Sequence, residues 1–144
     1  MSSVTRPRTH HIALTVTDID ASVDWYQAIF GVNFKMDVPH QGGVGKLLMD
    51  DSGELVIVLH RHDGNEGALF DETATGLDHV GFFVPGRADL QAWQEHLERG
   101  GVTRSETAAK PSTQSPIADE AYGSVLVFRD PDNIQLEIFS PPGA

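Results

Sequence analysis

The chain has 144 residues, with 10 basic and 21 acidic side chains and no cysteine. This length favours one domain, and the missing thiols exclude disulfides, zinc–thiolate sites, iron–sulfur clusters and a cysteine nucleophile. The net charge of −11 argues against a general affinity for nucleic acids or anionic membranes. With a polar N-terminus and no long apolar run, we expect a cytoplasmic protein without a membrane span.

The first half of the chain predicts a strand, a helix and three further strands. His11–Val16 alternates apolar and polar residues as a strand does. Asp18–Gly31 is typical of a helix that Asp20 caps and that Gly31 ends. Three extended runs follow, separated by Gly-Gly and Ser-Gly turns: Val32–Val38, Val44–Met49 and Glu54–Arg61.

The second half predicts the same order. Leu77–Val84 is expected to be a strand and Ala88–Gly100 a helix. The polar segment Lys110–Ala121 contains two prolines and is predicted to be a loop. The other predicted pieces are a short extended stretch and two strands joined by an Asp-Pro-Asp-Asn turn: Val102–Arg104, Ser124–Phe128 and Ile134–Phe139.

The first predicted strands of the two halves also have similar sequences. His-Ile-Ala-Leu-Thr-Val stands at 11–16 and His-Val-Gly-Phe-Phe-Val at 79–84. An internal repeat constrains the fold strongly. A unit of this size cannot bury its sheet alone, so we expect the two to pack as paired modules.

Three ionisable side chains lie on strands that are otherwise apolar. Alternation puts His11, His79 and Glu137 on the less aliphatic face of their strands. An ionised carboxylate there costs several kcal/mol unless it is paired or bound to metal. Two histidines and one carboxylate are the ligand set of non-haem iron enzymes. Alternatively, the histidines are hydrogen-bonded strand residues and Glu137 faces solvent.

Two further residues are candidates for catalysis. His60 shares a strand face with Val58 and could transfer a proton; alternatively it begins a solvated loop. Tyr122 could donate its hydroxyl to a substrate oxygen; alternatively it packs its own loop. His10 competes with its neighbour as a ligand if the strand register slips by one residue. Apolar residues on these faces favour a partly apolar substrate: Val56, Val58, Phe83 and Phe139.

Three motifs together resemble the vicinal oxygen chelate superfamily: HIALTVTDIDASVDWYQAIFG (11–31), LDHVGFFV (77–84) and FRDPDNIQLEIF (128–139). This family includes glyoxalase I, methylmalonyl-CoA epimerase, extradiol dioxygenases, fosfomycin-resistance enzymes and bleomycin-binding proteins. In the third motif Asn133 replaces the glycine of the family's turn, and asparagine also tolerates positive φ.

The resemblance implies an α+β fold in a single domain over 1–144. Two tandem βαβββ modules, about 9–62 and about 76–140, would form a cup-shaped mixed sheet with helices on its outer face. The cup would hold one divalent metal, with His11, His79 and Glu137 as ligands and no other cofactor. The family also implies a homodimer, and the ligands could come from one chain or from two.

The resemblance leaves the reaction open. Glyoxalase I and methylmalonyl-CoA epimerase carry a fourth ligand where this chain has Val58, whereas extradiol dioxygenases and fosfomycin-resistance transferases have three ligands. Few basic residues near the motifs could clamp a phosphonate, which disfavours fosfomycin. We favour an extradiol-type ring-cleaving dioxygenase with Fe(II), although Zn, Mn, Ni or Co would also fit the ligands. The alternatives are a lyase, isomerase or epimerase that forms an enediolate with His60 as the base, and a non-catalytic protein that binds an antibiotic or metabolite.

Overall fold

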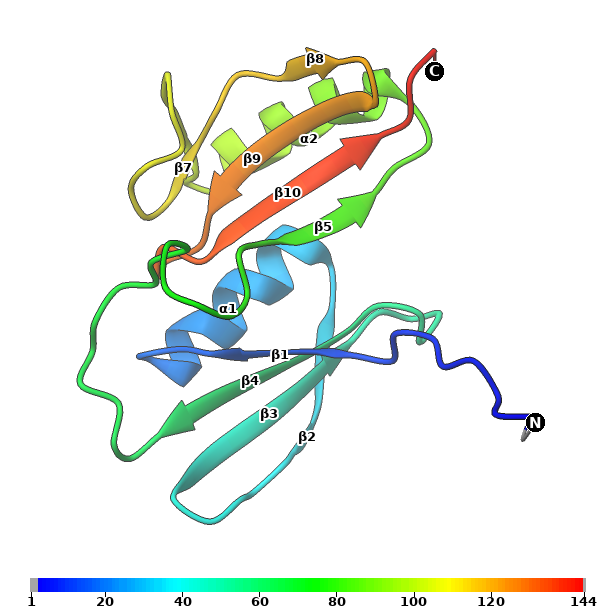
Figure 1. Cartoon of the computed structure of the whole chain (residues 1–144). Coiled ribbons are helices and arrows are strands. Elements are labelled where there is room, and N and C mark those ends of the chain that lie inside the picture. The colour runs from blue at the N-terminus through cyan, green and yellow to red at the C-terminus, as the bar shows by residue number, and fades with distance from the viewer. Residues whose placement is uncertain (1–2, 144) are drawn as a thin grey trace. The chain divides into compact units, whose positions relative to one another are not determined.

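The chain folds into two compact units, each with its own sheet and helix (Figure 1). A computed structural model describes residues 3–143, and the units are Met1–Glu66 and Gly67–Ala144. The two predicted modules, about 9–62 and about 76–140, fall within these bounds. The structure confirms the α+β class and the tandem arrangement of the modules.

Unit one has the predicted order of strand, helix and three strands. Its elements are β1 (Ile12–Thr15), α1 (Ile19–Phe30), β2 (Asn33–Asp37), β3 (Gly43–Met49) and β4 (Val56–His62). The sheet order is β1-β4-β3-β2. Strand β1 runs parallel to β4, and the other pairs are antiparallel. The sheet is therefore mixed, as predicted.

Helix α1 begins at an aspartate cap and ends at a glycine. Asp18 is extended, and its carboxylate accepts a hydrogen bond from the Ala21 N–H at 3.1 Å. The prediction that Asp20 caps the helix is wrong, because Asp20 lies in the first turn. Its negative charge there interacts favourably with the helix dipole. Gly31 adopts the left-handed conformation with φ 69°, which glycine reaches without steric cost.

The core of unit one lies between α1 and one face of its sheet. Alternation turns Leu14 of β1 and Ile57 and Leu59 of β4 to the same face, and all three are buried. Helix α1 packs on β3 and β4 and adds Tyr26, which is fully buried. Burial of an apolar side chain of this size contributes roughly 1.5–3 kcal/mol. The opposite face carries both polar and apolar side chains, among them His60 and the buried Val58.

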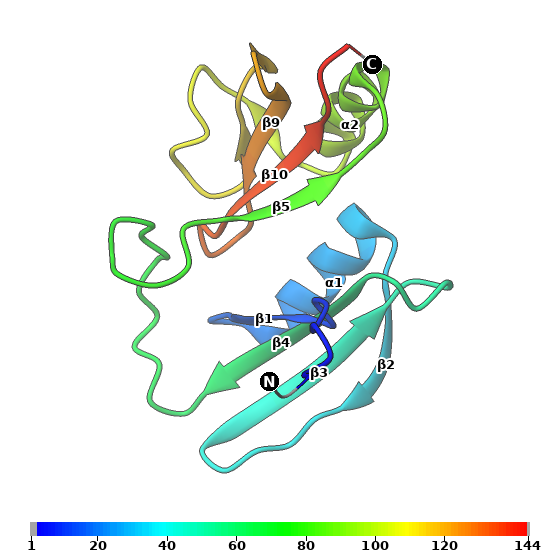
Figure 2. The ribbon, with the colours of Figure 1, turned by 45° about the vertical axis from the view of Figure 1, so that its right-hand side comes forward.

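Unit two repeats the arrangement with additional short strands (Figure 2). Its elements are β5 (Val80–Phe83), α2 (Arg87–Arg99), β6 (Thr103–Arg104), β7 (Thr113–Gln114), β8 (Ala118–Glu120), β9 (Gly123–Arg129) and β10 (Gln135–Ser140). The sheet order is β5-β10-β9-β7-β6, and β8 pairs with β9. Strand β5 runs parallel to β10, just as β1 runs parallel to β4.

The segment Lys110–Ala121 is not only a loop, because it contains β7 and β8. Gln114 of β7 is fully buried, and its side-chain amide donates to the carbonyls of Gln94 and Val102 at 3.1 and 3.0 Å. These contacts and the pairing with β9 stabilise strands whose local sequence does not favour them.

The turn before β10 forms as predicted. The Asp130 carboxylate accepts hydrogen bonds from the N–H groups of Asp132 and Ile134, both at 2.8 Å. Asn133 has φ 70°, which asparagine tolerates better than most residues. This turn pairs Glu137 with Val127 in the antiparallel hairpin.

Neither helix of the described residues has the length and hydropathy of a membrane span.

Candidate functional site

In both units the first strand pairs in the same register with the last strand of the unit. In unit two, Glu137 of β10 pairs with Gly81, the second residue of β5. In unit one, Val58 of β4 pairs with the second residue of β1. Because His79 directly precedes β5 and His11 directly precedes β1, Val58 occupies in unit one the position that Glu137 has in unit two. The register thus agrees with the expected place of Val58, whose side chain offers no ligand atom.

Unit two brings two of the predicted ligands together. The Nε2 atom of His79 lies 3.4 Å from the Oε1 atom of Glu137, and the two side chains are 38% and 20% exposed. Glu137 leans over Gly81, where an added Cβ would lie 3.5 Å from Oε1. Two donor atoms about 2.1 Å from one cation are about 3.4 Å apart when they subtend roughly 110° at it. The pair therefore fits one divalent cation in spacing and in chemistry.

His79 is held from its other side by two residues that the sequence analysis did not identify. Its Nδ1 atom lies 2.6 Å from Oδ1 of Asp78, and the Gln135 amide donates to the same oxygen at 3.1 Å. The pKa of His79 is raised above its ordinary value: the hydrogen bond with Asp78 raises it most, burial lowers it, and the charge of Glu137 raises it further. The sequence could have indicated both residues by their positions. Asp78 directly precedes His79, and Gln135 lies two residues before Glu137 and therefore on the same strand face.

Unit one supplies the third predicted ligand and a group of imidazoles. His11 is exposed, and its Nδ1 atom lies 2.8 Å from Nδ1 of His10. His60 is half-buried on the same sheet face. Its ring centroid lies 4.9 Å from that of His40 and 6.1 Å from that of His62.

The surroundings of His60 favour the neutral form of its imidazole. Burial lowers its pKa most, and the nearby charges of His40, His62 and His11 lower it further. Gly45 leaves room for the ring, since an added Cβ there would lie 2.8 Å from the Cε1 atom of His60. A neutral imidazole with a depressed pKa can accept a proton near neutral pH.

The described residues contain no ready-made set of metal ligands. Within residues 3–143, no three or more His, Asp or Glu side chains are arranged to hold a metal ion, and this includes the imidazoles around His60. The structure brings together His79 and Glu137, while His11 belongs to unit one and to no such set.

Tyr122 lies far from Glu137 within unit two. It occupies the turn between β8 and β9 and is 62% exposed. Val127 is the register partner of Glu137. Tyr122 precedes Val127 by five residues, which at about 3.3 Å per residue is about 16 Å along the strand. The predicted contact of Tyr122 with substrate therefore stays a prediction.

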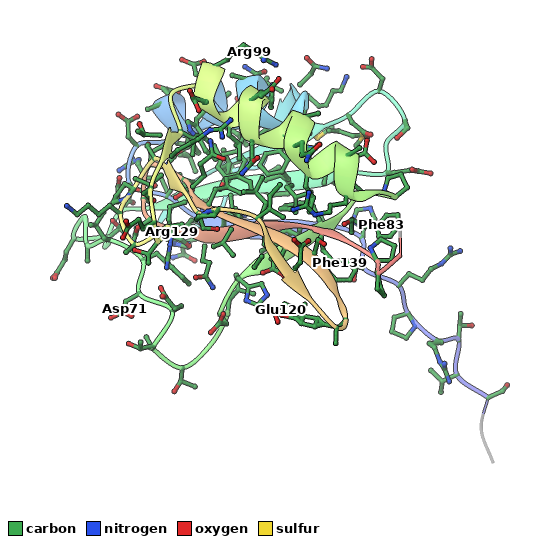
Figure 3. The ribbon with its side chains drawn as sticks, turned by 90° about the horizontal axis from the view of Figure 1, so that it is seen from above. Asp71, Phe83, Arg99, Glu120, Arg129 and Phe139 are labelled. Atoms are coloured by element: carbon green, nitrogen blue, oxygen red, sulfur yellow. The ribbon has the colours of Figure 1, made fainter. Side chains whose placement is uncertain are left out.

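Two aromatic side chains flank the His79–Glu137 pair. Phe83 of β5 and Phe139 of β10 are register partners and lie side by side (Figure 3). Phe83 is 69% exposed, whereas the predicted apolar residues Val56 and Val58 are buried. Phe139 follows Glu137 by two residues and therefore shares its face. Exposed aromatic surface beside two candidate ligands suits an aromatic or otherwise apolar substrate.

Comparisons with known proteins agree with this architecture. The family model described as Glyoxalase/Bleomycin resistance protein/Dioxygenase superfamily matches residues 8–138. The chain is 29% identical over 133 residues to the uncharacterized protein YaeR of Escherichia coli strain K12, covering 90% of this chain and 93% of that protein.

Solved structures with the same fold were also found. A glyoxylase/bleomycin resistance protein/dioxygenase domain from Frankia sp. EAN1pec is 32% identical, with a TM-score of 0.81 over 97% of this chain and 96% of that one. A variant of the fosfomycin resistance protein FosX from Listeria monocytogenes, complexed with Mn(II) and 1S,2S-dihydroxypropylphosphonic acid, is 18% identical. Its TM-score is 0.63 over 94% of this chain and 90% of that one.

Proposed function

Because the chain belongs to the glyoxalase/bleomycin resistance protein/dioxygenase superfamily, we propose that it is a divalent-metal-dependent enzyme that acts on a small oxygen-chelating substrate. The observation that carries this proposal is the pairing of His79 Nε2 with Glu137 Oε1 at 3.4 Å. A protein of the same fold, the FosX variant, has been crystallised with Mn(II). The cysteine-free sequence favours the cytoplasm as the place of action.

We assign the third ligand to His11, the residue of unit one that corresponds to His79. The shared register of the two units supports this assignment. A homodimer, in which the ligands come from one chain or from two copies, is part of the proposal. When bound, a divalent metal supplies Lewis acidity and orients a chelating substrate.

The reaction that the residues favour is extradiol-type ring cleavage with Fe(II). Three protein ligands leave coordination positions open for substrate and dioxygen, and Val58 removes the carboxylate that a glyoxalase I reaction would need. Phe83 and Phe139 offer an aromatic ring an apolar contact surface. His60 is the base we expect to take a proton from a phenolic hydroxyl, because its lowered pKa favours the neutral imidazole, which can accept one.

The same base would serve a second candidate, a lyase, isomerase or epimerase that abstracts a proton next to a carbonyl. His60 favours this reaction as much as the first, since both require a neutral imidazole. The two candidates differ in their use of dioxygen. Only the first consumes it.

Oxygen uptake by freshly iron-loaded protein with a panel of catechols tests the proposal. We expect uptake by the wild type and by His96→Ala, a control that removes an imidazole from α2, and a large loss in His60→Gln. Absence of uptake with every catechol, together with solvent deuterium exchange beside a substrate carbonyl, would replace the first candidate by the second. Ligand binding that survives both chelator treatment and His79→Ala would instead indicate a non-catalytic binding protein.

A further inference from the structure

The Nδ1 atom of His79 lies at one end of a continuous chain of hydrogen bonds that starts at a buried arginine. Arg129 of β9 is 5% exposed. Its guanidinium donates to the carbonyl of Ala108 and to the carboxylate of Glu72, and Figure 3 labels Arg129 in unit two. From there the chain passes through Gln135 and Asp78 to the imidazole.

All five N–H donors of Arg129 are used, which fixes its orientation. Nε donates to the Ala108 carbonyl at 2.6 Å, and Nη1 donates to Glu72 at 2.8 Å and to the Asn133 carbonyl at 3.1 Å. Nη2 donates to the other oxygen of Glu72 and to Oε1 of Gln135, both at 3.0 Å. A guanidinium can only donate and does not lose its proton in proteins.

The direction of every later bond follows from this fixed donor. Because Arg129 only donates, Gln135 must present its carbonyl oxygen to the arginine and its NH₂ group to Asp78. The Asp78 carboxylate accepts from that NH₂ group at 3.1 Å and from His79 at 2.6 Å. An ionised carboxylate only accepts, so Nδ1 of His79 carries a proton. In the neutral imidazole, the lone pair is then on Nε2, the atom 3.4 Å from Glu137.

We propose that Asp78 and Gln135 are positioning residues, which fix the tautomer and the ring orientation of His79 so that Nε2 is the metal-binding atom. This inference rests on the proposed metal site, because it assigns these residues a role toward that site. Carboxylates that accept the second N–H of a metal-binding histidine typically contribute 10- to 100-fold in metal affinity. Arg129 and Glu72 anchor the chain of bonds in the interior of unit two.

Two measurements on the full-length protein test the inference. The first is ¹⁵N NMR of the metal-free protein, which reports which imidazole nitrogen of His79 carries the proton. We expect Nδ1–H in the wild type and a shift toward Nε2–H in Asp78→Ala. The second is calorimetric titration with Mn(II) alone, where Asp78→Ala should weaken binding by about 10- to 100-fold and Gln135→Ala by a smaller factor.

Matched controls separate this role from general effects of the substitutions. Asp119→Ala removes an equally charged, exposed carboxylate of the same unit, which pairs with Arg87 at 2.7 Å. Gln91→Ala removes an exposed amide from α2. Both controls should leave the His79 tautomer and the Mn(II) affinity at their wild-type values.

The outcomes distinguish the inference from the proposed function. If His79→Ala abolishes Mn(II) binding while Asp78→Ala changes neither tautomer nor affinity, the positioning role is refuted and the metal site stands. If His79→Ala binds Mn(II) as tightly as the wild type, the metal proposal fails. In that case the NMR measurement still decides whether Asp78 orients the ring.

Discussion

Replacing Arg129 by methionine should destabilise unit two more than any exchange of an exposed arginine. Methionine has a similar length but no donors, so the Ala108 carbonyl, the Glu72 carboxylate and the Gln135 amide lose their partner together. The guanidinium is 6% exposed and the Glu72 side chain 30% exposed. The ion pair therefore has one buried partner, Arg129, and one partly exposed partner, Glu72.

The magnitude follows from these exposures. Breaking a buried ion pair by removing one partner costs about 3–5 kcal/mol, and an unsatisfied buried acceptor costs about 1–3 kcal/mol. Glu72 can regain water because nearly a third of its side chain is exposed, whereas the buried Ala108 carbonyl cannot. We therefore expect Arg129→Met to lose about 3 kcal/mol of the free energy of unfolding, the lower end of the ion-pair range.

Urea unfolding followed by tryptophan fluorescence measures this loss in unit two. A Trp25→Phe background leaves Trp93, which stacks on Phe128 with ring centroids 6.4 Å apart, as the fluorophore. With a slope of about 1–3 kcal/mol per molar urea, the midpoint should fall by about 1–3 M.

Arg87→Met is the matched control. Its partner is also a carboxylate of unit two, Asp119, but the two side chains are 38% and 58% exposed, and exposed pairs contribute little. If Arg129→Met shifted the midpoint no more than Arg87→Met does, the hydrogen bonds of the buried guanidinium would not stabilise unit two.

Three other predictions concern the ion pair and the imidazole group. The Arg–carboxylate pair lowers the pKa of Glu72 from 4.5 to about 2, so its contribution to stability is present above pH 4.5 and is lost as the pH falls toward 2; Glu72→Gln should flatten the urea midpoints over that window. Gly45→Ala would place a Cβ 2.8 Å from the His60 ring and should cost about 1–3 kcal/mol of unfolding free energy, whereas Gly64→Ala, with open space around it, should cost far less in the same assay. Burial lowers the pKa of His60 most and the charge of His40 lowers it further, so His40→Gln should raise that pKa in an NMR titration, and an unchanged or lower value would contradict the contribution of His40.

The order of elements was predictable because each main element carries its own local signal. The Asp130–Asn133 turn has residues that favour it, and Asn133 takes the expected positive φ of 70°. The helix itself was placed correctly, but its cap was assigned to Asp20 because Asp18 and Asp20 are equally good caps, and only the hydrogen bond to the Ala21 N–H decides between them.

The two short strands β7 and β8 had no local signal. They lie in a polar stretch with prolines, and they form because β9 offers a free edge and because the buried Gln114 amide satisfies two carbonyls. Tertiary pairing of this kind overrides local propensity.

Part of the candidate site was also within reach of the sequence. Alternation placed His79 and Glu137 on one face, and their proximity in unit two agrees with it. Five residues separate Arg129 from its partner Gln135, one more than the Asp130–Asn133 turn contains, so only the hairpin and not this register could have been found. The bond from Gln135 to Asp78 could not, because it depends on side-chain conformations that no sequence period determines.

Metal stoichiometry measured in the same preparation as native mass tests the central claim most directly. We predict one divalent ion per chain in the wild type and in His96→Ala, and its loss in each of three substitutions: His11→Ala, His79→Ala and Glu137→Gln. Retention of the full metal content by His11→Ala or by Glu137→Gln would contradict the assigned ligands. A wild-type protein that binds no divalent ion at all would contradict the metal-dependent function itself.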